Sequence, residues 1–351
     1  MSSNLALFLF IAYFIFAIIA DNLPQNKRRG VLALVCIALT FMVGFRNIYI
    51  WGDSAIYIKS FQDNNDLFHL NAFDAPFGYA ERGFFYLSTL LKVFSDSPEF
   101  YLTTISGISF FFLYKSFDKY SIYPLFGVAI YLARFYTGRN MMQIRACIAI
   151  AIIIYFTFLI KDKKWWKYLL VVAISYTLHH SALIALPLLF LRNYIIKPKH
   201  IYIGIILSLM ISQFLGGPIR NWIQASDFAN DMASSYIKEN SERAFANDLT
   251  NPVIWYQIFI LFAFTFYEDR LKPLSKYYYI FRNGYFYSTC ILIVLCQFAI
   301  LSGRTSTIFA TFEIAMVPML LYMFGKKERM GLYLIFGIAY IFLFYMNWPI
   351  K

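Results

Sequence analysis

Long apolar runs recur along the whole chain and are separated only by short polar stretches. They begin at the first residues and continue to the last, which leaves no room for a separate water-soluble domain. A helix of about 20 apolar residues crosses the hydrocarbon core of a bilayer. Within that core, only a helix or a closed barrel satisfies the backbone polar groups. The pattern therefore predicts an all-α, polytopic integral membrane protein.

We predict about twelve transmembrane helices in a single transmembrane domain covering residues 1–351. The predicted spans are 5–20, 30–45, 100–117, 121–135, 143–160, 166–178, 181–196, 202–216, 252–267, 284–301, 305–324 and 331–348. The apolar stretch 83–94 is too short to span, and we expect an interfacial or re-entrant helix there. Polar segments near 46–98 and 217–251 are the predicted periplasmic loops.

The basic residues are not distributed at random over the loops. More than half of the 31 lie in alternate loops and are mostly lysine, which places those loops in the cytoplasm. The other loops favour arginine, whose planar fork of donors suits phosphate and carboxylate. These arginines are Arg46, Arg82, Arg134, Arg139, Arg145, Arg220, Arg243 and Arg304. We expect an anionic ligand on the outer face. The net charge of +12 does not form a stripe that would track a nucleic acid.

The alternation of charge also predicts a helix break at His179-His180. A single long helix over 166–196 would move every later lysine-rich loop to the outside. A break places both histidines at an outward-facing turn between short helices, which membrane proteins tolerate where such helices line a cavity. No carboxylate or cysteine lies at ligand spacing from them, so we expect neither a metal nor a cofactor.

Three charged residues of the first outer loop are candidates for a site. Arg46 leaves the second predicted span, and Asp53 precedes a short predicted helix at 53–61. Glu81 precedes the short helix at 83–94. Arg46 could be an interfacial anchor, and the two carboxylates could be helix-terminal residues favoured by capping or the helix dipole. Alternatively, Arg46 and Asp53 form an anion site with an acidic neighbour, and Glu81 binds sugar hydroxyls or acts as a base.

Further candidates lie within or beside apolar runs. Arg139 shares a helix face with Gln143, and Arg145 lies inside the fifth run, where a charge is costly. We interpret Arg139 and Arg145 as phosphate ligands, although Arg145 could also snorkel to the interface. Arg304 follows a serine and a glycine. About nine residues on, a buried Glu313 must be paired, hydrogen-bonded or protonated, and it could hold an arginine in place.

Five stretches around these residues resemble the EpsG/Wzy-type bacterial polysaccharide polymerases. They are VGFRNIYIWGDSAIYIKSF (43–61), ERGFFYLSTLLKVF (81–94), NMMQIRACIAIAI (140–152), LHHSALIALPL (178–188) and LSGRTSTIFATFEIAMVP (301–318). The chain departs from the family pattern twice. It reads WGD where the family usually has GTD, and Ala146 follows Arg145 where a glutamine is common.

The resemblance implies a fold like that of the GT-C-type membrane glycosyltransferases and a place in the bacterial plasma (inner) membrane. The implied donor and acceptor are glycans linked to undecaprenyl diphosphate, held by membrane lipid at a site that faces the periplasm. A chain-length regulator (polysaccharide co-polymerase) and a flippase are further implied partners. The implied product is O-antigen or exopolysaccharide.

The hypothesis for the chemistry assigns one role to each candidate. His179 is the first choice for the group that deprotonates or orients the acceptor hydroxyl, with Asp53 and Glu81 as alternatives. The diphosphate ligands are Arg46, Arg139, Arg145 and Arg304, and the supporting residues are Glu313 and His180. Three other functions stay open: transfer to lipid A by an O-antigen ligase, transport of lipid-linked sugar by a flippase, and acyl transfer at His179.

Overall fold

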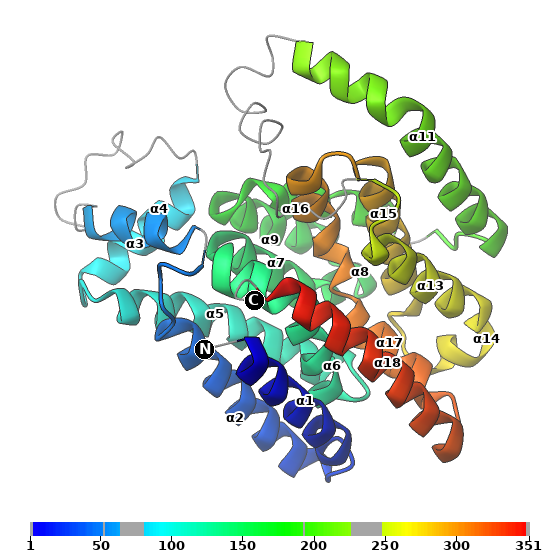
Figure 1. Cartoon of the computed structure of the whole chain (residues 1–351), viewed down its shortest axis with the longest axis horizontal. Helices are drawn as coiled ribbons and strands as arrows, with labels where there is room; N and C mark the ends of the chain where they lie inside the picture. The colour runs from blue at the N-terminus through cyan, green and yellow to red at the C-terminus, as the bar shows by residue number, and fades with distance from the viewer. Residues whose placement is uncertain (1–2, 52, 64–80, 192–193, 226–247, 349–351) are drawn as a thin grey trace. The chain divides into compact units, whose positions relative to one another are not determined.

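The computed structural model describes residues 3–51, 53–63, 81–191, 194–225 and 248–348 (Figure 1). Within these residues the chain forms helices and connecting loops and no β-strand, which confirms the all-α prediction. Five of the described segments are long and apolar enough to cross a membrane: Ser3–Ala20, Ile144–Lys161, Pro198–Pro218, Thr305–Tyr322 and Lys326–Asn347. The chain is therefore an all-helical membrane protein. The total of about twelve spans stays a prediction.

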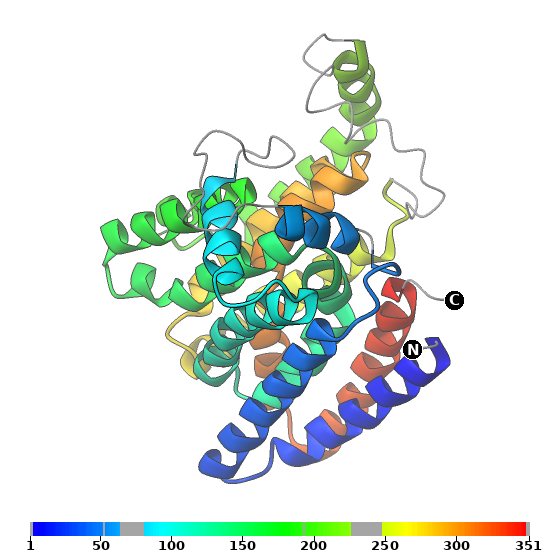
Figure 2. The ribbon, with the colours of Figure 1, turned by 90° about the vertical axis from the view of Figure 1, so that its left-hand side faces the viewer.

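The chain divides into two compact units, and the first comprises Met1–Leu186 with Glu313–Lys351. Its elements are α1 (Ser3–Ala20), α2 (Gln25–Gly44), α3 (Ser54–Asp63), α4 (Arg82–Lys92), α5 (Pro98–Tyr120), α6 (Pro124–Tyr131), η2 (Leu132–Met142), α7 (Ile144–Phe156), α8 (Phe158–Lys161), α9 (Trp165–Leu178), η3 (His180–Ala185), α17 (Glu313–Tyr322) and α18 (Lys326–Asn347). Adjacent helices in this unit pack in the order α2, α5, α7, α9, and α1 lies along α18 (Figure 2).

Helix α6 forms the centre of the first unit, since all eight of its residues are buried. It packs against α1, α5 and α17. Asp21, in the turn after α1, caps α6 by accepting hydrogen bonds from the Leu125 and Phe126 N–H groups at 3.0 and 2.7 Å. These contacts satisfy two of the donors that every helix N-terminus leaves open. The outer helices keep apolar side chains exposed, such as Leu34 and Ile37 of α2, as lipid-facing helices do.

Helix α6 continues directly into η2, an 11-residue π-helix. The prediction had placed the end of the span at 135, but the helical run continues to Met142. Gln143 ends it, and its N–H bonds the Gly138 carbonyl at 3.1 Å in the i→i−5 pattern. π-Helical turns are rare and occur frequently at functional sites.

The second unit, Pro187–Phe312, contains α10 (Pro187–Leu191), α11 (Pro198–Ala225), α13 (Pro252–Phe266), α14 (Glu268–Leu271), η5 (Lys272–Leu274), α15 (Tyr278–Val294) and α16 (Ala299–Ala310). Helices α10, α11, α13 and α16 all pack against α15. The fully buried Arg282 of α15 pairs with Glu268 and donates to the Ile196 carbonyl at 2.6 Å.

Three boundaries in the second unit correct the sequence prediction. A loop was expected at 302–304, but α16 runs through these residues and its helical run ends at Ala310. Helix α11 continues to Ala225 instead of ending at 216, with Pro218 inside it. Arg282, expected in a cytoplasmic loop, lies within α15 because that helix begins earlier, at Tyr278. Glycine, serine and arginine suggested loops, but residue propensity is a weak signal, and these segments lie within longer helices.

Candidate functional site

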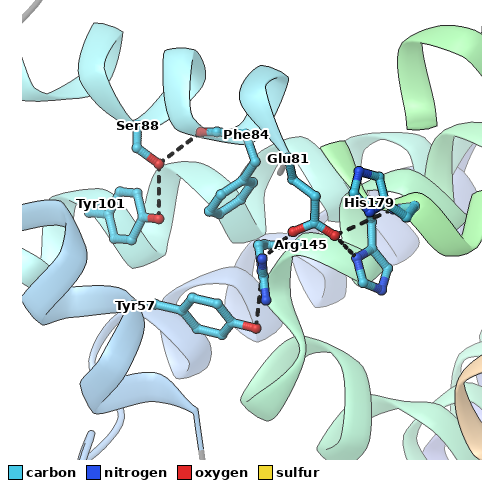
Figure 3. A network of polar contacts seen from close by, with 8 residues as sticks. Tyr57, Glu81, Phe84, Ser88, Tyr101, Arg145 and His179 are labelled. Atoms are coloured by element: carbon cyan, nitrogen blue, oxygen red, sulfur yellow. Dashed lines mark hydrogen bonds and ion pairs between the residues drawn. The ribbon is translucent and has the colours of Figure 1, made fainter. Parts of the chain in front are cut away.

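The Glu81 carboxylate joins two of the predicted site residues. One carboxylate oxygen accepts from Nη1 of Arg145, and the other contacts Nδ1 of His179 (Figure 3). The side chains of Arg145 and His179 are each 14% exposed and that of Glu81 is 8% exposed. The sequence had proposed these three residues separately, and the fold brings them into direct contact. We call them the Glu81 cluster.

Each member of the cluster lies where a helix begins or ends. Glu81 precedes α4 and makes no side-chain cap hydrogen bond to it, so its carboxylate serves the cluster instead of the helix. Arg145 is in the first turn of α7, directly after the break at Gln143. His179 ends α9 in an extended conformation, φ −160° and ψ 127°, before the 3₁₀-helix η3. The prediction of a break at His179 is confirmed.

A glycine lets α4 approach α9 closely enough to form the cluster. A Cβ added at Gly83 would lie 2.2 Å from Oγ1 and 2.8 Å from the backbone oxygen of Thr177. Real Cβ atoms do not approach that closely, and the backbone oxygen cannot swing away. Gly83 therefore fixes the spacing between Glu81, two residues before it, and His179, two residues after Thr177.

The cluster favours an ionised Glu81 and a defined tautomer of His179. Burial raises the pKa of Glu81, but the hydrogen bond and charge of His179 and the charge of Arg145 outweigh burial and lower it below its usual value. An ionised carboxylate can only accept hydrogen bonds, so Nδ1 of His179 must carry a proton and donate it to Glu81 in a hydrogen bond. Nε2 of His179 then carries the lone pair and can accept a proton, the arrangement that a carboxylate imposes on a catalytic histidine.

Aromatic side chains support Arg145 on the side away from His179. The Tyr57 hydroxyl accepts from Nε of Arg145 at 3.3 Å, and the guanidinium lies 5.1 Å from the centre of the Tyr57 ring (Figure 3). Phe84 packs edge-on against Tyr57, with ring centres 6.4 Å apart. This packing limits the rotamers of Arg145, and the sequence offered no signal for the contact beyond the position of Tyr57 near Asp53.

Arg46 forms a second cluster with the start of α3. Its Nε–H and an Nη2–H donate to Oγ of Ser54 at 3.2 and 2.8 Å, and an Nη1–H donates to the Val43 carbonyl at 2.9 Å. The Ser54 hydroxyl in turn donates to the Met141 carbonyl at 3.1 Å. Burial lowers the pKa of Arg46 to about 10, so the guanidinium stays charged at neutral pH. The sequence pattern indicated Arg46 but gave no signal for Ser54.

Glu313 pairs with Arg134, which answers the question that the sequence left open. Nε and Nη2 of Arg134 donate to the two carboxylate oxygens, each at 3.0 Å. The side chains are 5% and 0% exposed. This two-pronged contact links η2 to α17 in the interior. Arg134 had no assigned role in the sequence, because 179 residues separate the partners.

The other predicted residues lie outside the Glu81 cluster. Arg139 is buried in η2, 4.4 Å from the centre of the Phe135 ring. The backbone N–H of His180 contacts Glu81 at 3.4 Å, while its ring stacks on Tyr176. Asp53 directly precedes α3, and its carbonyl accepts from the Tyr57 N–H, but no described contact links it to Glu81.

Arg304 belongs to α16 in the second unit, and its side chain lies outside the described residues. Its proposed role as a diphosphate ligand therefore stays a prediction. Residues 64–80 and 226–247, within the two predicted periplasmic loops, are also outside the described part of the chain.

Comparison with known proteins identifies the family of the chain. No solved structure matches the chain. The chain is similar to the amylovoran biosynthesis protein AmsC of Erwinia amylovora, with 22% identity over 329 residues that cover 90% of this chain and 84% of that protein. The model of the EpsG family matches residues 30–351, and the chain therefore belongs to the EpsG family.

Proposed function

We propose that the chain is a membrane glycosyltransferase that polymerises oligosaccharide repeat units carried on undecaprenyl diphosphate, at the outer face of the plasma membrane. The family and the similarity to a protein named for amylovoran biosynthesis support a role in making a polysaccharide. The observation that carries the chemistry is the Glu81 cluster, which combines a cation with an oriented histidine.

In the proposed reaction, a hydroxyl of the acceptor glycan attacks the anomeric carbon of the donor. The new glycosidic C–O bond forms as the bond to the diphosphate oxygen breaks, and the lipid diphosphate leaves with the electron pair. Nε2 of His179 takes the hydroxyl proton. Glu81 keeps Nδ1 protonated and stabilises the imidazolium that results, as the carboxylate of a catalytic triad does.

The charge that develops on the leaving diphosphate needs positive groups placed in advance. Arg145 and Arg46 are our main candidates, and Arg139 and Arg304 remain candidates from the sequence. Arg145 forms an ion pair with Glu81, which neutralises most of its charge, whereas Arg46 forms no ion pair with a carboxylate among the described residues. We therefore assign Arg145 mainly to the reacting centre and Arg46 mainly to the diphosphate. No step requires a metal or cofactor.

The direct test is polymerisation by the purified full-length protein in lipid nanodiscs, with repeat units on undecaprenyl diphosphate and gel analysis of the products. We expect His179→Ala to reduce turnover at least 100-fold, the lower range for loss of a general base. The exposed His200 supplies the matched control, and His200→Ala should retain activity. Near-normal turnover in His179→Ala would rule out histidine catalysis. Polymerisation should also continue in EDTA.

The products also separate the competing functions. Sugar joined to lipid A would identify an O-antigen ligase, and growth on the carrier lipid would identify a polymerase. Movement of labelled lipid-linked sugar across the bilayer, without new glycosidic bonds, would identify a flippase. Transfer of sugar to lipid A, or movement of lipid-linked sugar without new glycosidic bonds, would contradict the proposal.

A further inference from the structure

Two adjoining cavities lie in the first unit, apart from the residues of the Glu81 cluster. The first has a volume of about 260 Å³ and lies between α1, α2, η2 and α18; we call it the apolar groove. The second has a volume of about 220 Å³ and is lined by residues that include Arg46, Asn47 and Trp51; we call it the Arg46 pocket. Met42 and Trp348 line both, so the groove and the pocket are neighbours.

Arg46 brings a buried positive charge to this pocket without a carboxylate to balance it. The side chain is 9% exposed and makes no ion pair with any described carboxylate. Among the described contacts, Ser54 and Val43 occupy three of its five N–H donors, which leaves two for a ligand. Burying a charge is costly unless an opposite charge compensates it. An anion in the pocket would supply that compensation.

Two further hydrogen-bond donors around the cavities have no described partner. The hydroxyl of Tyr136 and Nε1 of Trp348 are buried and make no hydrogen bond with the described residues. The two residues are 1% and 4% exposed and line the apolar groove at its Arg46 end: Trp348 also lines the Arg46 pocket, and Tyr136 is an electrostatic neighbour of Arg46. Native proteins leave few buried donors unsatisfied, so each such group needs an explanation. A ligand that accepts hydrogen bonds would satisfy both, together with Arg46.

We propose that the Arg46 pocket and the apolar groove together bind a prenyl diphosphate, with its diphosphate at Arg46 and the first isoprenoid units in the groove. The pocket is complementary to a phosphate in charge and donors, and the groove to a hydrocarbon chain. Helices α1 and α18 are both candidate spans, so the rest of a long chain can continue into the bilayer. The inference rests on the proposed function and specifies where the lipid carrier lies.

Helix α3 connects this site to the Glu81 cluster. Ser54 bonds Arg46, and Tyr57, three residues later, bonds Arg145. Residues three apart lie on one face of a helix, about one turn from each other. A diphosphate at Arg46 would thus lie about one helical turn from Arg145, where the leaving group of the donor must be. For this reason we assign the site to the donor carrier.

The test measures binding of radiolabelled undecaprenyl diphosphate to the purified full-length protein, with inorganic pyrophosphate and phosphatidylglycerol as competitors. Ala38→Trp should fill the groove and weaken prenyl diphosphate binding at least tenfold, while pyrophosphate binding changes less than twofold. Arg46→Gln should weaken both. Ile37→Trp is the matched control, because Ile37 is the preceding residue of α2, is 52% exposed and does not line the groove.

Two conservative variants test the unsatisfied donors. Tyr136→Phe keeps the ring and removes only the hydroxyl, whereas Trp348→Phe removes the indole N–H and also reduces the ring; each should weaken diphosphate binding about tenfold, the usual effect of losing a hydrogen bond to a charged group. Because the Tyr136 hydroxyl has no described protein partner, the thermal stability of Tyr136→Phe should not fall, while Trp348→Phe should lose some stability because Trp348 packs against Trp51 and Phe344. Unchanged binding in both variants, equal effects of Ala38→Trp and Ile37→Trp, or equally effective displacement by phosphatidylglycerol would each overturn the inference.

The binding and polymerisation assays can fail independently. Groove-dependent binding without polymer formation would reject the proposed function and leave a prenyl diphosphate site in place. Polymerisation with no effect of Ala38→Trp or Arg46→Gln on binding would reject the site and leave the function. His179→Ala should bind prenyl diphosphate normally in either case, because His179 is assigned to the acceptor hydroxyl.

Discussion

Replacing Glu81 with glutamine would change the cluster by one charge and almost no volume. A glutamine at this position offers one acceptor oxygen and one NH₂ group. Arg145 can only donate, so the oxygen must face Arg145 and the NH₂ group must face Nδ1 of His179. Nδ1 then accepts, and the proton moves to Nε2, the atom that has to accept the hydroxyl proton. The variant therefore holds His179 in the wrong tautomer.

The expected loss of turnover in Glu81→Gln is about 10²- to 10⁴-fold, the range that general base catalysis contributes. The cost in stability is smaller, about 1–3 kcal/mol, for a buried hydrogen bond to a charged group. Polymerisation rate and thermal denaturation in the same nanodiscs separate the two effects. Glu81→Asp keeps the charge but is one methylene shorter, and it should recover part of the activity at a reduced rate.

Glu99 provides the matched control for this substitution. It is an exposed glutamate in the first turn of α5, hydrogen-bonded to Ser97 at 2.7 Å, and Glu99→Gln should leave turnover within twofold of the parent. If Glu81→Gln also keeps more than half of the activity, with an unchanged pH profile, then Glu81 does not set the tautomer of a catalytic histidine. Misfolding would appear instead as a lowered melting temperature.

Three further perturbations follow from the fold. Gly83→Ala forces α4 away from Thr177 and should reduce turnover about 100-fold, as misplacement of a catalytic group by about 1 Å does. Arg134→Met removes the ion pair of the fully buried Glu313 and should cost about 3–5 kcal/mol, measured by denaturation, with partial recovery when Glu313→Leu is added. Burial raises the pKa of Asp21 from 3.8 to about 6. The free energy of unfolding should therefore fall by up to about 3 kcal/mol as the pH rises through 6. Asp21→Asn should flatten this pH dependence.

Each of these perturbations has a control or a contrary result. A Cβ at Gly331 meets no atom within 4 Å, so Gly331→Ala should leave turnover unchanged. For the buried pair, a double variant as unstable as the sum of both single variants would show no coupling. For Asp21, the sign follows from the raised folded-state pKa: the proton binds more tightly in the folded state, so the stabilisation is complete at low pH. A free energy of unfolding that rises between pH 4 and 7 in the parent but not in Asp21→Asn would contradict this prediction.

The sequence predicted the helical class and several site residues because these depend on local patterns. Apolar runs identify helices, and charge parity located the break at His179, which the structure confirms. Boundaries were predicted less well. Residues 302–304 and 217–225 are helical despite glycine and proline, because the propensity of single residues is only a weak signal within a longer helix.

Pairings between distant residues could not be predicted from the sequence. Glu81 precedes Arg145 by 64 residues and His179 by 98, and nothing local indicates that one carboxylate bonds both. The same holds for Arg134 and Glu313. The role of Gly83 is equally hidden, since its cause is a threonine on another helix. Local patterns therefore identify which residues are costly to bury, and only the fold shows how each one is compensated.

The buried arginines differ in what balances their positive charge, and this difference separates arginines that maintain the structure from an arginine that can bind a diphosphate. Arg134, Arg145 and Arg282 each face a carboxylate of the chain, so most of their charge is neutralised before any substrate arrives. Such an ion pair fixes the positions of its two side chains and contributes little net attraction for a diphosphate. Arg46 differs because its electrostatic neighbours are tyrosines, which are neutral at pH 7. An arriving diphosphate would gain the full attraction of that charge and would remove the cost of burying it. Of these four arginines, Arg46 should therefore contribute most to diphosphate affinity, while Arg145 should affect turnover more than binding.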